Sequence, residues 1–216
     1  DHNDQNQKEP DCKTDPEAVA ESKAREEGSI DKHRAAEPVR APSPTAPTSP
    51  TSPAAETEAE VKANAGYMVK NLKEYGWEYI VVDIRWYVEN DHPGGYNQKD
   101  PVYVMDEYGR FTPAVNRFPS AAGGKGFKPL ADYIHGKGLK FGIHVMRGIP
   151  VIAVQNNTPV SGSAVKAQDI YSPEDQCPWL RDMYTIVTEK DGAQEYYNSI
   201  FQLYASWDVD FVKVDD

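Results

Sequence analysis

The distribution of aromatic residues restricts which part of this 216-residue chain can fold. All 23 Phe, Trp and Tyr residues lie at or after Tyr67, whereas six prolines lie between Pro38 and Pro53 in a stretch of Ala, Ser and Thr. A segment of that composition cannot bury enough apolar surface to offset the chain entropy lost on folding. The sequence therefore predicts a disordered tail over residues 1–55 and a folded part over residues 56–216.

The charge and the cysteine count exclude several classes of protein. Asp and Glu outnumber Lys and Arg by 34 to 23, a formal net charge of −11, so nucleic acid and anionic lipid are not expected as partners. No apolar run approaches the ~20 residues that span a bilayer, and no secretory signal is visible. Two cysteines, Cys12 and Cys177, do not make a disulfide scaffold, which favours a reducing, cytoplasmic compartment. The oligomeric state is left open.

Helical and strand-like patterns alternate through the second part of the chain. Thr57 and Glu60 have the spacing of a capping box, and such a box opens a helix. Helices that alternate with strands, without hairpin turns, predict a parallel sheet with right-handed crossovers. The connections over 84–126 and 146–190 are long and irregular, and they leave strand carboxyl ends, where such sheets bind ligands. The predicted helices cover about 57–75, 127–137 and 191–205, and the predicted strands cover 79–83, 139–145 and 210–215.

The strand patterns predict where polar side chains gather. Side chains alternate across a strand, so Lys213 and Asp215 share one face while Val212 and Val214 share the other. If the apolar faces all meet helices, then Asp83, His144, Lys213 and Asp215 lie together at the carboxyl ends of the strands, with Gly142 leaving room beside them.

The pairing of Lys213 with Asp215 suggests a catalytic role. A lysine in an apolar strand needs an anionic partner, and Asp215 is the nearest one. An ammonium beside a carboxylate keeps it ionised, which is what a retaining glycosidase requires of its nucleophile. Trp86, Tyr87 and Trp179 lie in the long connections, where they would form either a platform for a sugar ring or ordinary packing beneath a loop.

Four segments, taken in order, resemble glycoside hydrolase family 27, the α-galactosidases and α-N-acetylgalactosaminidases. They are residues 79–86 (YIVVDIRW), 116–120 (NRFPS), 138–144 (GLKFGIH) and 208–216 (DVDFVKVDD). The resemblance implies an α/β fold, a (β/α)₈ TIM barrel, of which this chain holds about strands two to four. It also implies a terminal α-linked galactose or N-acetylgalactosamine as substrate, cleaved by double displacement without a cofactor or a metal.

The resemblance also implies roles for individual residues. Asp215 corresponds to the catalytic nucleophile. Arg147 lies in the run over 144–150, which looks like a bacterial-type branch of the family. The residues expected to contact the sugar are Asp83, Trp86, His144, Arg147 and Lys213.

The chain departs from the family pattern at three places. Ile84 replaces the second of two paired aspartates, which leaves the identity of the sugar open. The family's opening Gly-Trp-Asn-Ser-Trp-like strand is missing. The acid/base carboxylate is expected beyond Asp216, on a later strand, so we expect a partial barrel that is unstable or inactive alone.

Two other functions remain open from the sequence. Asp83, His144, Asp215 and Asp216 are oxygen and nitrogen ligands that a divalent metal accepts, which would make a metal-dependent barrel hydrolase. The neighbouring ammonium of Lys213, and the opposite direction expected for Asp216, count against this function. The second is a non-catalytic or degenerate carbohydrate-binding fragment.

Overall fold

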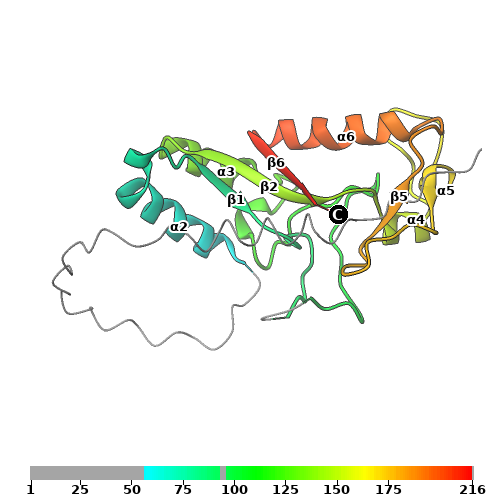
Figure 1. Cartoon of the computed structure of the whole chain (residues 1–216), viewed down its shortest axis with the longest axis horizontal. Helices are drawn as coiled ribbons and strands as arrows, with labels where there is room; N and C mark the ends of the chain where they lie inside the picture. The colour runs from blue at the N-terminus through cyan, green and yellow to red at the C-terminus, as the bar shows by residue number, and fades with distance from the viewer. Residues whose placement is uncertain (1–55, 93–95, 216) are drawn as a thin grey trace, which may run out of the picture. The chain divides into compact units, whose positions relative to one another are not determined.

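The centre of the fold is a three-stranded parallel sheet (Figure 1). The computed structural model describes residues 56–92 and 96–215, so the predicted tail and Asp216 lie outside the described residues. The strands, in spatial order, are β1 (Tyr79–Val82), β2 (Lys140–Met146) and β6 (Phe211–Asp215). The parallel pairing predicted from the alternation of helices and strands is confirmed.

A helix precedes each of these three strands, as predicted. The helices are α2 (Glu58–Asn71), α3 (Lys128–Gly136) and α6 (Ala193–Ser206). The capping box at the start of α2 is present: the Thr57 Oγ1 atom accepts from the backbone N–H of Glu60 at 3.4 Å, and the Glu60 carboxylate accepts from the backbone N–H of Thr57 at 2.8 Å. These bonds satisfy N–H groups that a helix start leaves unpaired, so the helix begins where the sequence predicts.

The two faces of the parallel sheet differ in exposure. Val82, Phe141 and Ile143 are fully buried, and the Phe141 ring packs edge-on against Phe127 beside α3. On the opposite face Tyr79 and Phe211 are 43 % and 46 % exposed, with their ring centroids 5.7 Å apart. The helices therefore cover one face of this sheet. Within the described part of the chain the other face is open at β1 and β6, whereas His144 of the middle strand is buried.

The segment after β2 contains regular structure that the sequence patterns do not predict. Three short antiparallel strands form a second sheet in the order β3 (Ile149–Pro150), β5 (Met183–Ile186), β4 (Tyr171–Ser172). The prediction of an irregular connection over 146–190 is therefore wrong, because strands of two to four residues are too short to show an alternating pattern. The remaining elements are the short helices α4 (Val151–Gln155) and α5 (Ala167–Ile170) and the 3₁₀ turns η1 (Lys73–Tyr75) and η2 (Pro119–Ala121).

Two hydrophobic clusters hold these elements together, and α6 contributes to both. Tyr204 and the adjacent Trp207 pack in the cluster beneath the parallel sheet, whereas Tyr196 packs in the cluster around the second sheet. Gly126 makes room for Trp207: a Cβ atom at Gly126, where φ is +56°, would lie 2.0 Å from the indole nitrogen. None of the helices in residues 56–92 and 96–215 is both long enough and apolar enough to cross a membrane.

Candidate active site

The predicted polar cluster forms at the carboxyl ends of the parallel strands. The Lys213 Nζ atom lies 3.3 Å from Asp83 Oδ1 and 3.7 Å from Asp215 Oδ2. The side chains of Asp83, Lys213 and Asp215 are 62 %, 45 % and 46 % exposed. One ammonium therefore lies between two carboxylates on the open face of the sheet, and the prediction that these residues gather there is confirmed.

His144 completes the cluster from the middle strand. It lies opposite Lys213 in the β2–β6 register, and its Nε2 atom is 3.4 Å from Asp215 Oδ2. Burial, which leaves the residue 1 % exposed, lowers the pKa of the imidazole, although the charge of Asp83 acts in the opposite direction. Its buried Nδ1 atom has no hydrogen-bond partner among the described residues. A neutral imidazole with one unsatisfied nitrogen therefore borders the Asp215 carboxylate.

Trp86 is attached to the cluster through the backbone. Its indole Nε1–H donates to the carbonyl oxygen of His144 at 2.7 Å, and its ring is 1 % exposed and packs against Phe127 and Trp207. Tyr87 is equally buried and stacks on Phe111 with 3.7 Å between ring centroids. As folded here, these two rings are packing residues and not an open sugar platform. Contact of Trp86 with a sugar stays a prediction.

Arg147 is tied to the neighbouring strand and to the second sheet. Its backbone N–H donates to the carbonyl oxygen of Asp215 at 3.0 Å, which extends the β2–β6 pairing. Its guanidinium lies 2.9 Å from Thr185 Oγ1 and 3.3 Å from the Asp175 carboxylate. The contact of Arg147 with a sugar is likewise untested.

Glu56 is an additional carboxyl beside the cluster that sequence reasoning missed. Its Oε2 atom accepts from the backbone N–H of Asp83 at 3.0 Å. Burial raises the pKa of the Glu56 carboxyl, and the charge of Asp83 adds to this effect. Glu56 immediately precedes Thr57, the cap residue of α2. This place at a predicted helix start is the only feature of the sequence that indicates Glu56.

A second, buried ionic network lies behind the cluster. Asp182 accepts four hydrogen bonds: two from Arg85 at 2.9 and 3.0 Å, one from the Tyr87 hydroxyl at 2.8 Å and one from the Tyr103 hydroxyl at 2.6 Å. Arg85 also donates to Asp91 at 2.6 Å. Arg85 has a φ of +66°, a conformation that is strained for a residue with a side chain. These bonds hold the connections after β1 and β2 together.

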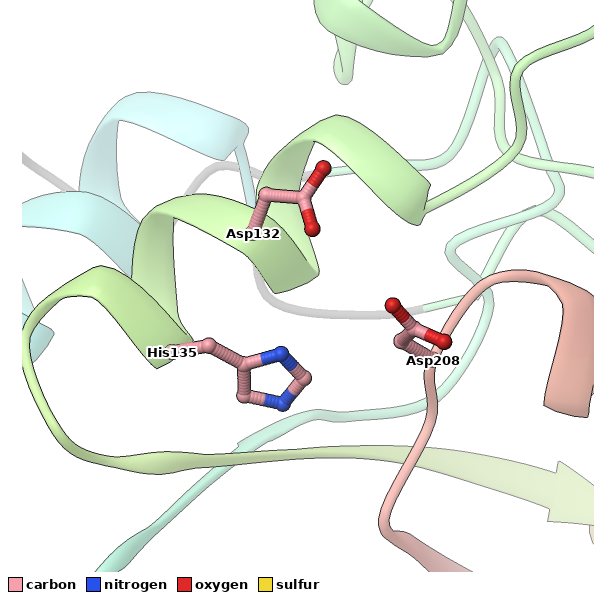
Figure 2. A group of neighbouring side chains, drawn as sticks. All are labelled: Asp132, His135 and Asp208. Atoms are coloured by element: carbon pink, nitrogen blue, oxygen red, sulfur yellow. The ribbon is translucent and has the colours of Figure 1, made fainter.

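Two other features of the described residues lie away from the cluster. Asp132, His135 and Asp208 place ligand atoms within 4.8 Å of one another and face each other from α3 and the segment before β6 (Figure 2). The Lys128 ammonium already pairs with both carboxylates, so we read this group as structural.

An apolar cavity of about 130 Å³ is lined by Val145, Val214 and α6, on the side of the strands opposite to Asp215.

The geometry of the cluster determines what it can do chemically. A carboxylate oriented by an ammonium at a strand end, and open on one side, suits attack on an electrophilic carbon. Lys213 would repel a divalent cation, and Asp216, the fourth ligand of the metal alternative, lies outside the described residues. The cluster therefore fits a nucleophile with a hydrogen-bonding surround better than a metal centre.

Comparison with known proteins identifies similar chains. No family model matches. The chain is 31% identical over 159 residues to "Alpha-galactosidase A" of Cellvibrio japonicus and 25% identical over 161 residues to "Alpha-galactosidase 3" of Hypocrea jecorina, covering 73% and 74% of this chain. A GH27 β-L-arabinopyranosidase from Geobacillus stearothermophilus, solved with arabinose, is 61% identical over 76% of this chain with a TM-score of 0.73. A putative α-N-acetylgalactosaminidase from Bacillus halodurans is 58% identical over 75%, with a TM-score of 0.71.

The chain is much shorter than these relatives. It covers 26% and 22% of the two curated α-galactosidases and 38% of each solved structure. The expectation of a partial TIM barrel is therefore supported at the level of the fold, because the parallel sheet has three strands where a complete barrel has eight.

Proposed function

The chain belongs to glycoside hydrolase family 27 over about 75% of its length, and on this premise we propose that the whole protein is a retaining glycosidase with Asp215 as nucleophile. The observation that carries the proposal is the position of Asp215: at a strand carboxyl end, 3.7 Å from the Lys213 ammonium and exposed on the open face of the sheet. The side chain therefore lies beside an ammonium and is exposed enough for a sugar to reach it.

The proposed reaction proceeds in two displacements. An Asp215 oxygen attacks the anomeric carbon while the bond from that carbon to the leaving oxygen breaks, and a carboxylic acid gives its proton to the leaving group. Water then attacks the glycosyl–Asp215 ester, the same carboxylate takes a proton from the water, and Asp215 is released. We assign no described residue to the acid/base role, which the family resemblance gives to a later barrel strand.

The neighbours of Asp215 have distinct proposed roles. Lys213 fixes the carboxylate and donates to a sugar hydroxyl, and Asp83, on the other side of the ammonium, accepts from a second hydroxyl. The Nε2 atom of His144, 3.4 Å from Asp215 Oδ2, helps to hold the carboxylate in position. Trp86 supports His144 through its carbonyl oxygen, and Arg147 supports the Asp215 backbone.

The proposed substrate is a terminal sugar with the ring configuration of α-D-galactose. The relatives are named for α-galactoside, α-N-acetylgalactosaminide and β-L-arabinopyranoside substrates. The arabinopyranoside keeps the galactose ring configuration and lacks the hydroxymethyl group. Ile84 packs against the hydrophobic core and cannot accept a hydrogen bond from a hydroxyl. The identity is 61% with the arabinopyranosidase and 58% with the putative α-N-acetylgalactosaminidase. Both observations favour the pentose, with the galactoside as the second candidate.

Covalent trapping tests the nucleophile without the acid/base residue. A dinitrophenolate leaves without being protonated, so a C2-fluorinated dinitrophenyl β-L-arabinopyranoside or α-galactoside needs only the nucleophile to transfer its sugar. Intact-mass spectrometry of the chain is expected to show one added glycosyl unit, and peptide fragmentation is expected to place it on Asp215.

Two variants control this measurement. Asp215→Asn is expected to abolish the added mass, whereas Asp191→Asn, a change at an exposed aspartate before α6, is expected to leave it unchanged. Labelling of another carboxylate, or no labelling by either sugar, would count against Asp215 as nucleophile. Turnover of unactivated glycosides is proposed for the whole protein, since its relatives are much longer than this chain.

A further inference from the structure

Two exposed aromatic rings from distant parts of the chain, Tyr96 and Trp179, contact each other. Tyr96 and Trp179 are 40 % and 41 % exposed. Their ring centroids are 6.0 Å apart and their planes are inclined by 44°. Tyr96 belongs to the connection after β1 and Trp179 to the one between β4 and β5, so a contact across 83 positions is made by the fold alone.

The ring pair is next to the proposed catalytic residues. Partial burial raises the pKa of the Tyr96 hydroxyl, and the charge of Asp83 raises it further, while Lys213 acts in the opposite direction. Both ends of the Lys213–Asp83 ion pair therefore act on the Tyr96 hydroxyl. The geometry agrees: the Tyr96 ring contacts Arg85, which is two residues after Asp83, and Asp83 pairs with Lys213 at 3.3 Å.

Contacts with Arg85 and hydrogen bonds in the two connections hold the ring pair in place. The guanidinium carbon of Arg85 lies 5.7 Å from the Tyr96 ring centroid, and Arg85 is itself fixed by its bonds to Asp182 and Asp91. The residue after Tyr96, Asn97, is buried and donates its backbone N–H to Asp91 at 2.8 Å. The Gln98 amide donates to the carbonyl oxygen of Trp179 at 3.1 Å. These contacts join the two connections on either side of the rings.

We propose that Tyr96 and Trp179 form the surface against which the leaving-group sugar of a disaccharide or longer glycoside packs. The proposal rests on the proposed function, since Asp215 defines which sugar is transferred and which one leaves. Aromatic rings held rigid and half open offer apolar contact to the C–H face of a pyranose, while the sugar hydroxyls stay in water. The Arg85–Asp182 network behind the rings supplies the rigidity.

Binding of matched ligands to the chain tests this surface. Calorimetry compares a methyl glycoside with a thio-linked disaccharide of the same terminal sugar, which resists hydrolysis. The disaccharide is expected to bind about tenfold more tightly, the factor that corresponds to the upper range for one aromatic contact. Trp179→Ala and Tyr96→Ala are expected to remove this difference, and Trp179→Phe and Tyr96→Phe to restore most of it.

Matched controls come from exposed aromatic residues elsewhere. Trp77 and Tyr75, 62 % and 74 % exposed, lie just before β1, at the opposite end of the strand from Asp83. Trp77→Ala and Tyr75→Ala are expected to keep the tenfold difference, and circular dichroism of all variants checks that they fold.

The outcomes separate this proposal from the proposed function. Covalent labelling of Asp215 with an unchanged disaccharide preference in Trp179→Ala would overturn the aromatic surface alone. If Trp179→Ala removes the preference for the disaccharide but Asp215 is not labelled, the aromatic sugar-binding surface is supported and the assignment of Asp215 as nucleophile is overturned. Binding of neither ligand, or equal binding of both by the unmutated chain, would overturn the aromatic surface.

Discussion

The molecule has two ionic groups, one around Lys213 and one around Arg85, and they differ in exposure and in contact distance. Around Lys213 the three charged side chains are roughly half exposed and separated by 3.3 and 3.7 Å. Around Arg85 the side chains of Arg85, Asp182 and Asp91 are 0 %, 2 % and 5 % exposed, with contacts of 2.6 to 3.0 Å. The first group is open on one side, whereas the second uses every acceptor site of its central carboxylate.

This difference shows how charge is used for two purposes. Charges that must meet a ligand keep spare hydrogen-bonding capacity and remain hydrated, so they contribute little to folding. Charges that join two connections are removed from water, which is tolerated only when every group has a partner. Arg85 lies two residues after Asp83, so the buried network positions the segment that carries Asp83 of the exposed group.

The largest effect is expected from breaking the buried network. Asp182→Ala leaves Arg85 with Asp91 as its remaining anionic partner and removes the acceptor of two tyrosine hydroxyls. The free energy of unfolding is expected to fall by about 3–5 kcal/mol, the usual cost of removing one partner of a buried pair. Urea denaturation of the chain, followed by tryptophan fluorescence, measures it.

An exposed aspartate in the same connection controls for the loss of a negative charge. Asp175→Ala removes a carboxylate that is 64 % exposed and 3.3 Å from Arg147. Its effect on unfolding is expected to stay below about 1 kcal/mol. Equal effects of Asp175→Ala and Asp182→Ala would remove the distinction between the two ionic groups.

An intermediate effect on the unfolding free energy is expected from His144. This residue is buried, although it borders the exposed ionic group around Lys213. Because burial lowers the pKa of its imidazole, the unfolded chain binds more protons than the folded chain just below the ordinary pKa of 6.5. The unfolding free energy should therefore fall as the pH drops below about 6.5, with at most about 1.4 kcal/mol per pH unit from this one group.

Two glutamine variants isolate this contribution from that of the carboxylates. In His144→Gln the slope of unfolding free energy between pH 7 and pH 5 should be shallower than in the unmutated chain. In His92→Gln, where the histidine is exposed, the slope should be unchanged. A slope in His144→Gln as steep as in the unmutated chain would contradict the assignment.

The smallest effect on stability is expected from Lys213. Lys213→Met removes the ammonium between Asp83 and Asp215, but both ion pairs are exposed, so the unfolding free energy should change by less than about 1 kcal/mol. Covalent labelling of Asp215 should nevertheless fall about tenfold, as expected for the loss of one charged contact. Rates of labelling and urea denaturation of the same sample measure both quantities.

A lysine on the neighbouring strand provides the matched control for Lys213. Lys140 lies at the start of β2, has a side chain that is 48 % exposed, and pairs with Glu78 at 3.4 Å. Lys140→Met should leave the labelling rate unchanged. If both methionine variants slow labelling equally, the slower labelling would be explained by a general effect of surface charge and not by a specific role of Lys213.

The success and failure of the sequence-based predictions follow the range of the interactions involved. The faces of β2 and β6 were predictable because side chains alternate along any strand, and this placed His144, Lys213 and Asp215 together. The second sheet was missed because its strands are too short to carry a pattern. Glu56 and Tyr96 were missed because neither stands in a periodic element, and only the folded chain brings them to Asp83.

The local framework follows from the sequence: the helix–strand order, the capping box at Thr57 and the face of each strand. These depend on backbone geometry and on neighbours a few residues away. Contacts between distant groups, by contrast, are visible only in the folded chain. Lys213 and Asp83 are 130 positions apart, and Arg85 and Asp182 are 97 apart. Such contacts depend on how whole elements pack, and the sequence near each residue carries no record of that packing.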